Sequence, residues 1–202
     1  MGITPDQFAK MQQRLAKPKR TPAPVLATPR TGPTRVHEVV LGIDPSLRGT
    51  GFGILRNTQP RPRLLAQGTI HSPAGWPRSR CLVNTAQVLR DAIQKHHPTV
   101  CAIEGLFYAQ NLQTALIMGE ARGICLLIAA EAGLDICEIA PRKVKQAIVG
   151  YGAAQKLAVA KMVQRMLQLA EIPEADAADA LALALAYLQE SRGFGSGLLK
   201  KI

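Results

Sequence analysis

The sequence predicts an α/β fold, and two kinds of segment carry this prediction. The runs 39–43 and 99–103 are short, apolar and rich in valine and isoleucine, which is typical of strands buried on both faces of a sheet. Longer segments, such as 79–96 and 111–132, carry apolar residues that favour helices. Buried strands and helices in one chain indicate a sheet flanked by helices.

The elements are expected in the following order. Strands are predicted at 39–44, 52–55, 63–70, 99–103 and 135–139, and helices at 5–17, 79–96, 111–132, 141–149, 153–170 and from 176 onward. Pro45 ends the first strand because proline donates no ladder hydrogen bond. The following glycine-rich turn indicates that the second strand is antiparallel to the first, and Gly133 and Gly150 end helices.

Composition divides the chain of 202 residues into three parts. Residues 1–37 contain seven Lys or Arg but one acid, and their many prolines predict a basic, disordered N-terminal extension. This extension is either a nucleic-acid tether or a solvated linker. Residues 38–190 form the expected folded domain, and residues 191–202 a flexible C-terminal tail. The net charge of +11 indicates a polyanionic partner, most often nucleic acid.

The same composition argues against secretion and membrane association. The first residues lack an apolar signal segment, and no apolar run is expected to be long enough to cross a bilayer. The four cysteines form no C-x-x-C pair, which favours a reduced, cytoplasmic protein over one with disulfides or structural zinc.

Four carboxylates occupy unusual places. Asp44 and Glu104 each end a buried strand, while Asp176 and Asp179 lie three residues apart on one face of an Ala- and Leu-rich helix. Each has an ordinary explanation, as a turn residue or as a complement to a helix dipole. Gathered together, however, they would repel one another unless divalent cations neutralised them, and such oxygen ligands select Mg²⁺ or Mn²⁺. Two such ions about 3.5–4 Å apart can cleave phosphodiesters, so the residues alone suggest a metal-dependent nuclease.

Several motifs then match a known family in order and spacing. They lie at 41–45 (LGIDP), 102–104 (AIE), 107–111 (FYAQN), 119–123 (GEARG), 144–146 (VKQ), 149–156 (VGYGAAQK) and 175–182 (ADAADALA). Over residues 38–190 the chain resembles the bacterial RuvC Holliday-junction resolvases. It departs from the family's usual pattern at Ser46, where glycine is common, and at Gly105-Leu106.

This resemblance implies a ribonuclease-H-like fold with a five-stranded mixed sheet flanked by helices. It implies a homodimer that nicks four-way junction DNA symmetrically during recombination and repair, in concert with the RuvA–RuvB branch-migration complex. Asp44, Glu104, Asp176 and Asp179 would hold two Mg²⁺ ions, with Asp179 rather than Asp176 as the direct ligand. Lys145 and Lys156 would join them in catalysis. The implied DNA-binding residues are Phe107, Tyr108, Arg142, Lys143, Lys145 and Lys156, with Phe107 stacking on an unpaired base.

Three alternatives remain open at this point. The Gly-Ile-Asp start also opens actin-like ATPases, although these need a second lobe for which the chain has no room. A nuclease of the same fold could act on structured RNA. A junction-binding module without catalysis is the third, and the presence of all four acids argues against it.

Overall fold

The structure is a computed structural model that describes residues 37–105, 111–192 and 199–202. Residues 36–202 form one compact unit. Its elements are β1 (Val39–Asp44), β2 (Gly49–Arg56), β3 (Arg63–His71), α2 (Arg78–His96), β4 (Val100–Glu104), α3 (Leu112–Glu131), β5 (Asp135–Ile139), α4 (Pro141–Val149), α5 (Lys156–Leu167), α6 (Ala175–Ser191) and β6 (Lys200–Lys201). The helix expected at 5–17 lies outside the described residues.

The strands form one mixed sheet in the order β3-β2-β1-β4-β5-β6. Strands β1, β4 and β5 are parallel, whereas β2, β3 and β6 are each antiparallel to a neighbour. The sequence predicts the first five strands. The sheet has a sixth because Lys200–Lys201, in the segment expected to be a flexible tail, pairs with Cys137 and Glu138 of β5.

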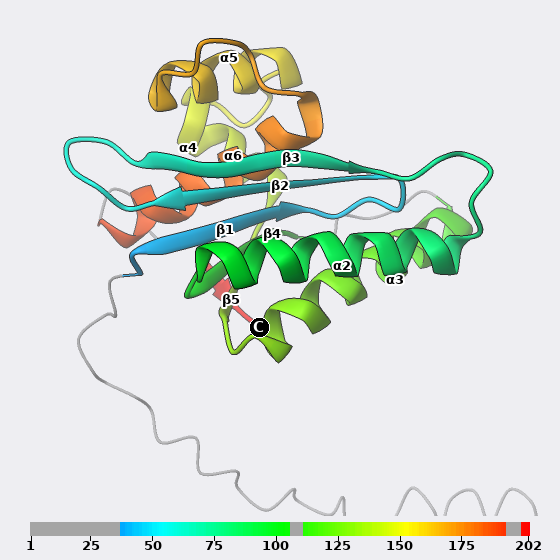
Figure 1. Cartoon of the computed structure of the whole chain (residues 1–202). Helices are drawn as coiled ribbons and strands as arrows, with labels where there is room; N and C mark the ends of the chain where they lie inside the picture. The colour runs from blue at the N-terminus through cyan, green and yellow to red at the C-terminus, as the bar shows by residue number, and fades with distance from the viewer. Residues whose placement is uncertain (1–36, 106–110, 193–198) are drawn as a thin grey trace, which may run out of the picture. The chain divides into compact units, whose positions relative to one another are not determined.

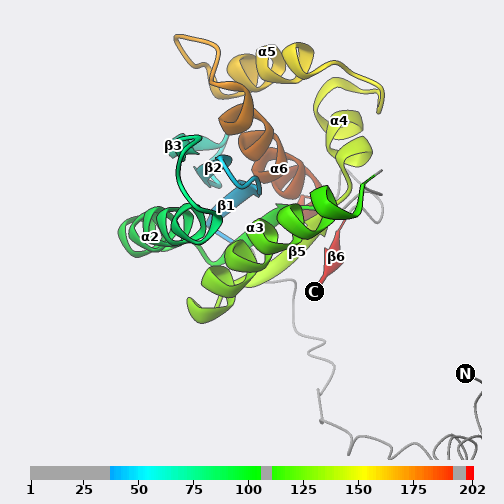
Figure 2. The same ribbon diagram turned by 90° about the vertical axis from the view of Figure 1, so that its right-hand side faces the viewer.

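Helices cover both faces of the sheet (Figures 1 and 2). Helices α2 and α3 pack on one face around Leu41, Ile43 and Ile103. Helices α4, α5 and α6 pack on the other face around Val40 and Ala102. Alternate residues of β1 and β4 therefore enter two separate cores, which explains why both strands are apolar along their whole length.

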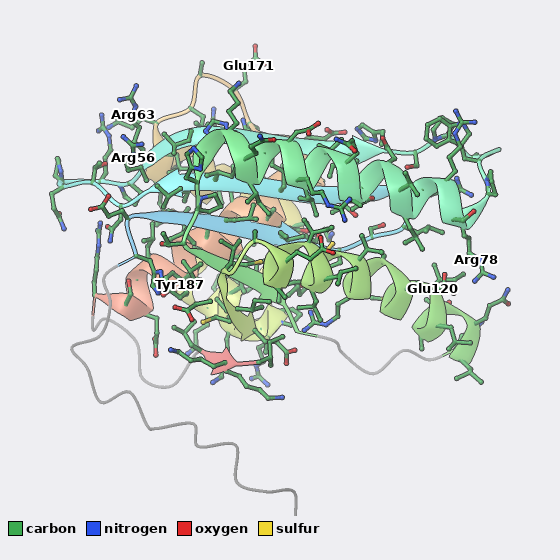
Figure 3. The ribbon with its side chains drawn as sticks, turned by 60° about the horizontal axis from the view of Figure 1, so that its bottom comes forward. Arg56, Arg63, Arg78, Glu120, Glu171 and Tyr187 are labelled. Atoms are coloured by element: carbon green, nitrogen blue, oxygen red, sulfur yellow. The ribbon has the colours of Figure 1, made fainter. Side chains whose placement is uncertain are left out.

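Local sequence signals account for the helix ends. The Asn111 side chain caps α3 by accepting hydrogen bonds from the backbone amides of Gln113 (2.8 Å) and Thr114 (3.5 Å). Helix α4 begins at Pro141 and ends at Gly150, whose φ of 93° suits glycine. Between α2 and α3, an ion pair joins Arg78 and Glu120 at 3.3 Å, and Figure 3 shows the two residues near each other at the start of α2.

Helix α3 differs from one sequence expectation. It has 20 residues and a mean hydropathy of 1.4 over its most apolar window, so it is long and apolar enough to span a membrane by those two criteria. The expectation that no apolar run has this length was wrong. The helix nevertheless packs on the sheet through Cys125, Ile128 and Ala129. It also carries two charged residues, Glu120 and Arg122, each of which forms an ion pair with a residue of another element. We therefore assign it to the fold rather than to a bilayer.

Candidate active site

Two of the predicted acids meet at the ends of adjacent strands. Strands β1 and β4 are parallel neighbours, and Ile43 pairs with Ile103. Asp44 and Glu104 follow these two residues as the last residues of their strands, so they lie side by side at the carboxyl edge of the sheet. Their carboxyl groups are hydrogen-bonded to each other. Both side chains are partly buried.

Small residues bring a third acid to the same edge. A Cβ atom on Gly42 would overlap the carbonyl oxygen of Ala180, and one on Gly51 would overlap the carbonyl oxygen of Asp176. The absence of side chains at these glycines lets the α6 backbone lie directly on β1 and β2. The alanines of α6 from Ala177 to Ala186 are buried. This close approach places Asp179, in the second turn of α6, beside Asp44.

The three acids and two lysines share one cleft of about 300 Å³. It is lined by Asp44, Pro45, Glu104, Met118, Pro141, Val144, Lys145, Lys156, Val159, Asp179 and Leu183. Lys145 comes from α4 and Lys156 from the start of α5, so three helices of one face of the sheet meet two strand ends here, and α3 adds Met118. The lysine Nζ of Lys156 lies 2.8 Å from Oδ2 of Asp179.

The pKa values of Asp44 and Glu104 are both raised, with burial as the largest cause. Burial, the neighbouring Glu104 and the neighbouring Asp179 together raise the pKa of Asp44 to about 8. Burial also raises the pKa of Glu104, while the hydrogen bond from Asp44 opposes that rise. Asp44 is therefore the proton donor of the pair. The hydrogen bond to Asp179 raises the pKa of Lys156, so its ammonium group stays charged.

The donor set suits a divalent metal ion. The cleft holds only carboxylate oxygens as anionic ligands, and these are the hard donors that Mg²⁺ and Mn²⁺ prefer. Burial, and after it the charges of Glu104 and Asp179, raises the pKa of Asp44, so a cation in the cleft would favour the charged form of this carboxyl group. Across the described residues, however, no three His, Cys, Asp or Glu side chains already converge on one metal position. A metal ion in this cleft would therefore need the carboxylates to turn toward a common point.

The remaining predicted residues lie around or beyond this cleft. Asp176 does not line it: its carboxylate faces Gly49, although its charge still contributes to raising the pKa of Lys156. Arg142 and Lys143 lie on α4 outside the cleft lining, and Arg142 packs against Gly152. Phe107 and Tyr108 lie outside the described residues.

One residue beside the site was not predicted from the sequence. Arg122 of α3 is 5% exposed, and its guanidinium donates hydrogen bonds to the backbone carbonyl of Glu104 and to Oε2 of Glu138. The sequence could have indicated it, because Arg122 lies one turn before the apolar Cys125 on the buried face of α3, where an arginine is rare unless it is paired.

The sheet order, the helices on both faces and the acidic cleft at the carboxyl edge place the protein in the class of ribonuclease-H-like resolvases. Comparison of the sequence with known protein families narrows this class to one family. The family model described as crossover junction endodeoxyribonuclease RuvC matches residues 40–187. The chain belongs to the RuvC family. It is accordingly a structure-specific DNA endonuclease, a hydrolase that resolves Holliday junctions in recombination.

Individual relatives support this assignment. A RuvC protein of Akkermansia muciniphila is 45% identical over 149 residues, which are 74% of this chain and 89% of the relative. One of Thermomicrobium roseum is 42% identical over 154 residues, which are 76% and 94% of the two chains. The structure of Thermus thermophilus RuvC in complex with a Holliday junction substrate covers 82% of this chain and all of that chain, with a TM-score of 0.74 and 31% identity. The yeast mitochondrial resolvase Ydc2 shares the fold, with a TM-score of 0.56 and 11% identity over 77% and 79% of the two chains.

Proposed function

We propose that the cleft of Asp44, Glu104 and Asp179 hydrolyses one phosphodiester of a four-way DNA junction with the help of two Mg²⁺ ions. The observation that supports this most strongly is the sharing of one cleft by three acids from β1, β4 and α6. When bound, the ions would activate a water molecule and stabilise the leaving oxygen, and Mn²⁺ has the same ligand preferences. Asp176, one turn earlier on α6, assists from outside the cleft.

The chain's own residues perform the remaining tasks. The carboxylates of Asp44 and Glu104 are fixed by two adjacent strands, so the distance between them is set by the sheet. Lys145 and Lys156 bring positive charge to the cleft, where they hold the scissile phosphate and offset the charge that develops on it. Lys156 is bound to Asp179 and is 66% exposed at its side chain, so it can turn from the acid to an entering phosphate.

DNA contacts extend beyond the cleft in this proposal. Arg142 and Lys143 on α4 continue the positive charge of Lys145 along one helix. Phe107 and Tyr108 follow the catalytic strand β4 in sequence, and we assign them to stacking on unpaired bases. The basic segment 1–37 adds affinity for phosphates that does not depend on sequence.

We also propose a homodimer, which would cut two opposed strands by paired nicks. Its support is the outer face of α3, where Leu112, Leu116 and Leu127 are 77%, 59% and 48% exposed. Gly119 and Gly123 lie between them on the same face, and a Cβ atom at either position would meet no other atom within 4 Å. A second copy could therefore pack closely on this apolar stripe.

Two further assignments rest on the family. The RuvA–RuvB branch-migration complex is the proposed partner at the junction, and a cytoplasmic location fits four free, buried cysteines. Co-sedimentation of the protein with RuvA–RuvB on junction DNA, compared with each component alone, tests the partner.

A nicking assay tests the central proposal. Synthetic four-way junctions are incubated with the wild type or with Asp44→Asn, with and without Mg²⁺. We expect paired nicks from the wild type with Mg²⁺, and junction binding without cleavage from Asp44→Asn. Cleavage by Asp44→Asn at the wild-type rate would contradict the proposal, and equal cleavage of structured RNA would favour a broader substrate.

A further inference from the structure

Arg122 is a buried charge that the proposed chemistry does not use. It faces the sheet from α3, together with Ala121, Cys125 and Ile128. A guanidinium group remains charged in proteins, and a charge at a core position is costly unless hydrogen-bonding partners surround it. The Arg122 side chain does not line the catalytic cleft, so the reason for a buried arginine here lies in the groups that it bonds.

Its partners belong to the two strands beside the site. One nitrogen of the guanidinium donates to the backbone carbonyl of Glu104, the last residue of β4. Another donates to Oε2 of Glu138 in β5 at 2.5 Å. The second carboxylate oxygen of Glu138 lies 3.9 Å from Nζ of Lys200 in β6. Arg122 thus joins α3 to three consecutive strands.

The contact with Glu104 has a geometric consequence. Strand β4 ends at Glu104, and the last backbone hydrogen bond to β5 there runs from the Gly105 amide to the Ile139 carbonyl at 2.9 Å, so Arg122 adds a side-chain anchor at the end of the ladder. Arg122 fixes the carbonyl of the residue whose carboxylate lines the cleft. The next residue, Gly105, packs against Glu138, because a Cβ atom there would lie 3.3 Å from Cγ of Glu138. The Arg122–Glu138 pair therefore contacts both the Glu104 carbonyl and the residue that follows it.

We propose that Arg122 is a positioning residue for Glu104. It does not touch the reacting atoms; it sets the place of the Glu104 carboxylate through the backbone and through Glu138. This inference rests on the proposed role of Glu104 as a metal ligand. Displacing a catalytic group by about 1 Å can cost about 100-fold in rate, so a backbone anchor at this point has a large effect.

The test compares Arg122→Met with Arg122→Lys in the full-length protein. Methionine has similar length but donates no hydrogen bond, whereas lysine keeps the charge and one donor group. Ile128→Ala is a matched control for stability: Ile128 is 1% exposed on the same helix and has no bond to Glu104. Arg90→Met is a matched control for loss of an α2–α3 ion pair, since Arg90 bonds Glu131 at 3.1 Å.

Three quantities are measured: the turnover number on a four-way junction, the dissociation constant for the junction, and the Mg²⁺ concentration that gives half of the maximal rise in melting temperature without DNA. For Arg122→Met we expect turnover to fall at least tenfold and the half-saturating Mg²⁺ concentration to rise at least threefold. The junction dissociation constant should stay within twofold. Arg122→Lys should recover part of both losses, and both controls should keep wild-type Mg²⁺ binding.

Two results would overturn the proposal. One is wild-type turnover and Mg²⁺ binding in Arg122→Met. The other is an equal loss in Ile128→Ala at the same drop in melting temperature, which would show a general effect of stability. If Arg122→Met does not fold, Glu138→Gln carries the test, with smaller losses in the same direction expected. The proposed function fails separately, through cleavage by Asp44→Asn, whatever the Arg122 variants do.

Discussion

The carboxyl groups of Asp44 and Glu104 are hydrogen-bonded to each other across two adjacent parallel strands, and Asp44 carries the proton. A carboxyl group protonated near neutral pH is unusual. It follows from burial and from the negative charges of Glu104 and Asp179 in the same cleft. A divalent cation bound in the cleft would lower the pKa of Asp44, so that Asp44 would lose this proton. Stability, pH and metal binding are therefore linked at this pair.

The first prediction concerns the pH dependence of stability without metal. The pKa of Asp44 is about 8 in the folded protein and near its ordinary value of 3.8 when unfolded. Between these values the folded state holds a proton that the unfolded state has lost, so the unfolding free energy contributed by Asp44 falls as pH rises from about 4 to 8. Denaturant unfolding in EDTA at pH 5, 6, 7 and 8 measures this decline.

Asp44→Asn is the matched variant for this measurement, because its amide can still donate to Glu104 but does not titrate. At pH 8 without metal it should be more stable than the wild type by about 1–2 kcal/mol. Added Mg²⁺ should stabilise the wild type more at pH 8 than at pH 6. Identical pH profiles for the two proteins would show that Asp44 does not hold the proton.

The second prediction concerns Lys156. Replacement by Met should lower turnover on junctions about 100-fold, the size of effect seen when one charge-stabilising donor is removed from an active site. Its ion pair with Asp179 is largely exposed, so the melting temperature should change little. Lys161→Met, an exposed lysine of the same helix outside the cleft lining, is the control and should keep its turnover within twofold. Equal turnover of both variants would assign Lys156 to the solvated surface.

The third prediction tests the close approach of α6. Gly51→Ala would push a methyl group into the backbone of α6 at Asp176, so we expect a destabilisation of about 3 kcal/mol and loss of cleavage. Gly75→Ala, an exposed turn position with open space around it and away from α3, should leave stability within about 0.5 kcal/mol of the wild type. Thermal unfolding of the two variants measures both changes in stability. A fully stable, active Gly51→Ala protein would contradict the packing of α6 on β2.

The fourth prediction concerns the dimer. Leu116→Glu places a charge on the exposed stripe of α3 and should convert the protein to monomers in sedimentation velocity experiments. Ile172→Glu changes a residue that is 44% exposed before α6, on the opposite side of the sheet, and should leave the dimer intact. A dimeric Leu116→Glu protein would exclude this face as the interface.

The fifth prediction concerns the basic segment. Deleting residues 1–35 should weaken junction binding and make the plot of log affinity against log salt concentration shallower by at least about 2, because each lost phosphate contact removes about 0.9. Binding titrations between 50 and 200 mM salt measure both quantities. Unchanged affinity and slope would make this segment a linker without a role in DNA binding.

The sequence was sufficient to predict β1 to β5 and the two strand-end acids, because buried parallel strands are continuous apolar runs and a carboxylate at their ends is conspicuous. It also placed Asp176 and Asp179 on one helix. It could not separate their positions: Asp179 enters the cleft and Asp176 faces Gly49, since this depends on how closely α6 approaches the sheet. That approach is set by glycines of other elements.

Two features depend on contacts that no local pattern reveals. Strand β6 has only two residues and forms because β5 offers a free edge, so no periodicity could indicate it. Arg122 lies in the motif 119–123 that resembles the family, but its hydrogen bonds to Glu104 and Glu138 join residues far apart in the chain. Such tertiary hydrogen bonds become visible only once the strands are in register.

The most direct measurement of the central claim is a crystal structure of the protein soaked in Mn²⁺, with the ions located by anomalous scattering. We predict anomalous peaks in the cleft within coordination distance of Asp44, Glu104 and Asp179, with Lys156 displaced from Asp179. Peaks only elsewhere, with the Lys156–Asp179 ion pair intact, would contradict the assignment of this cleft as the metal-dependent nuclease centre.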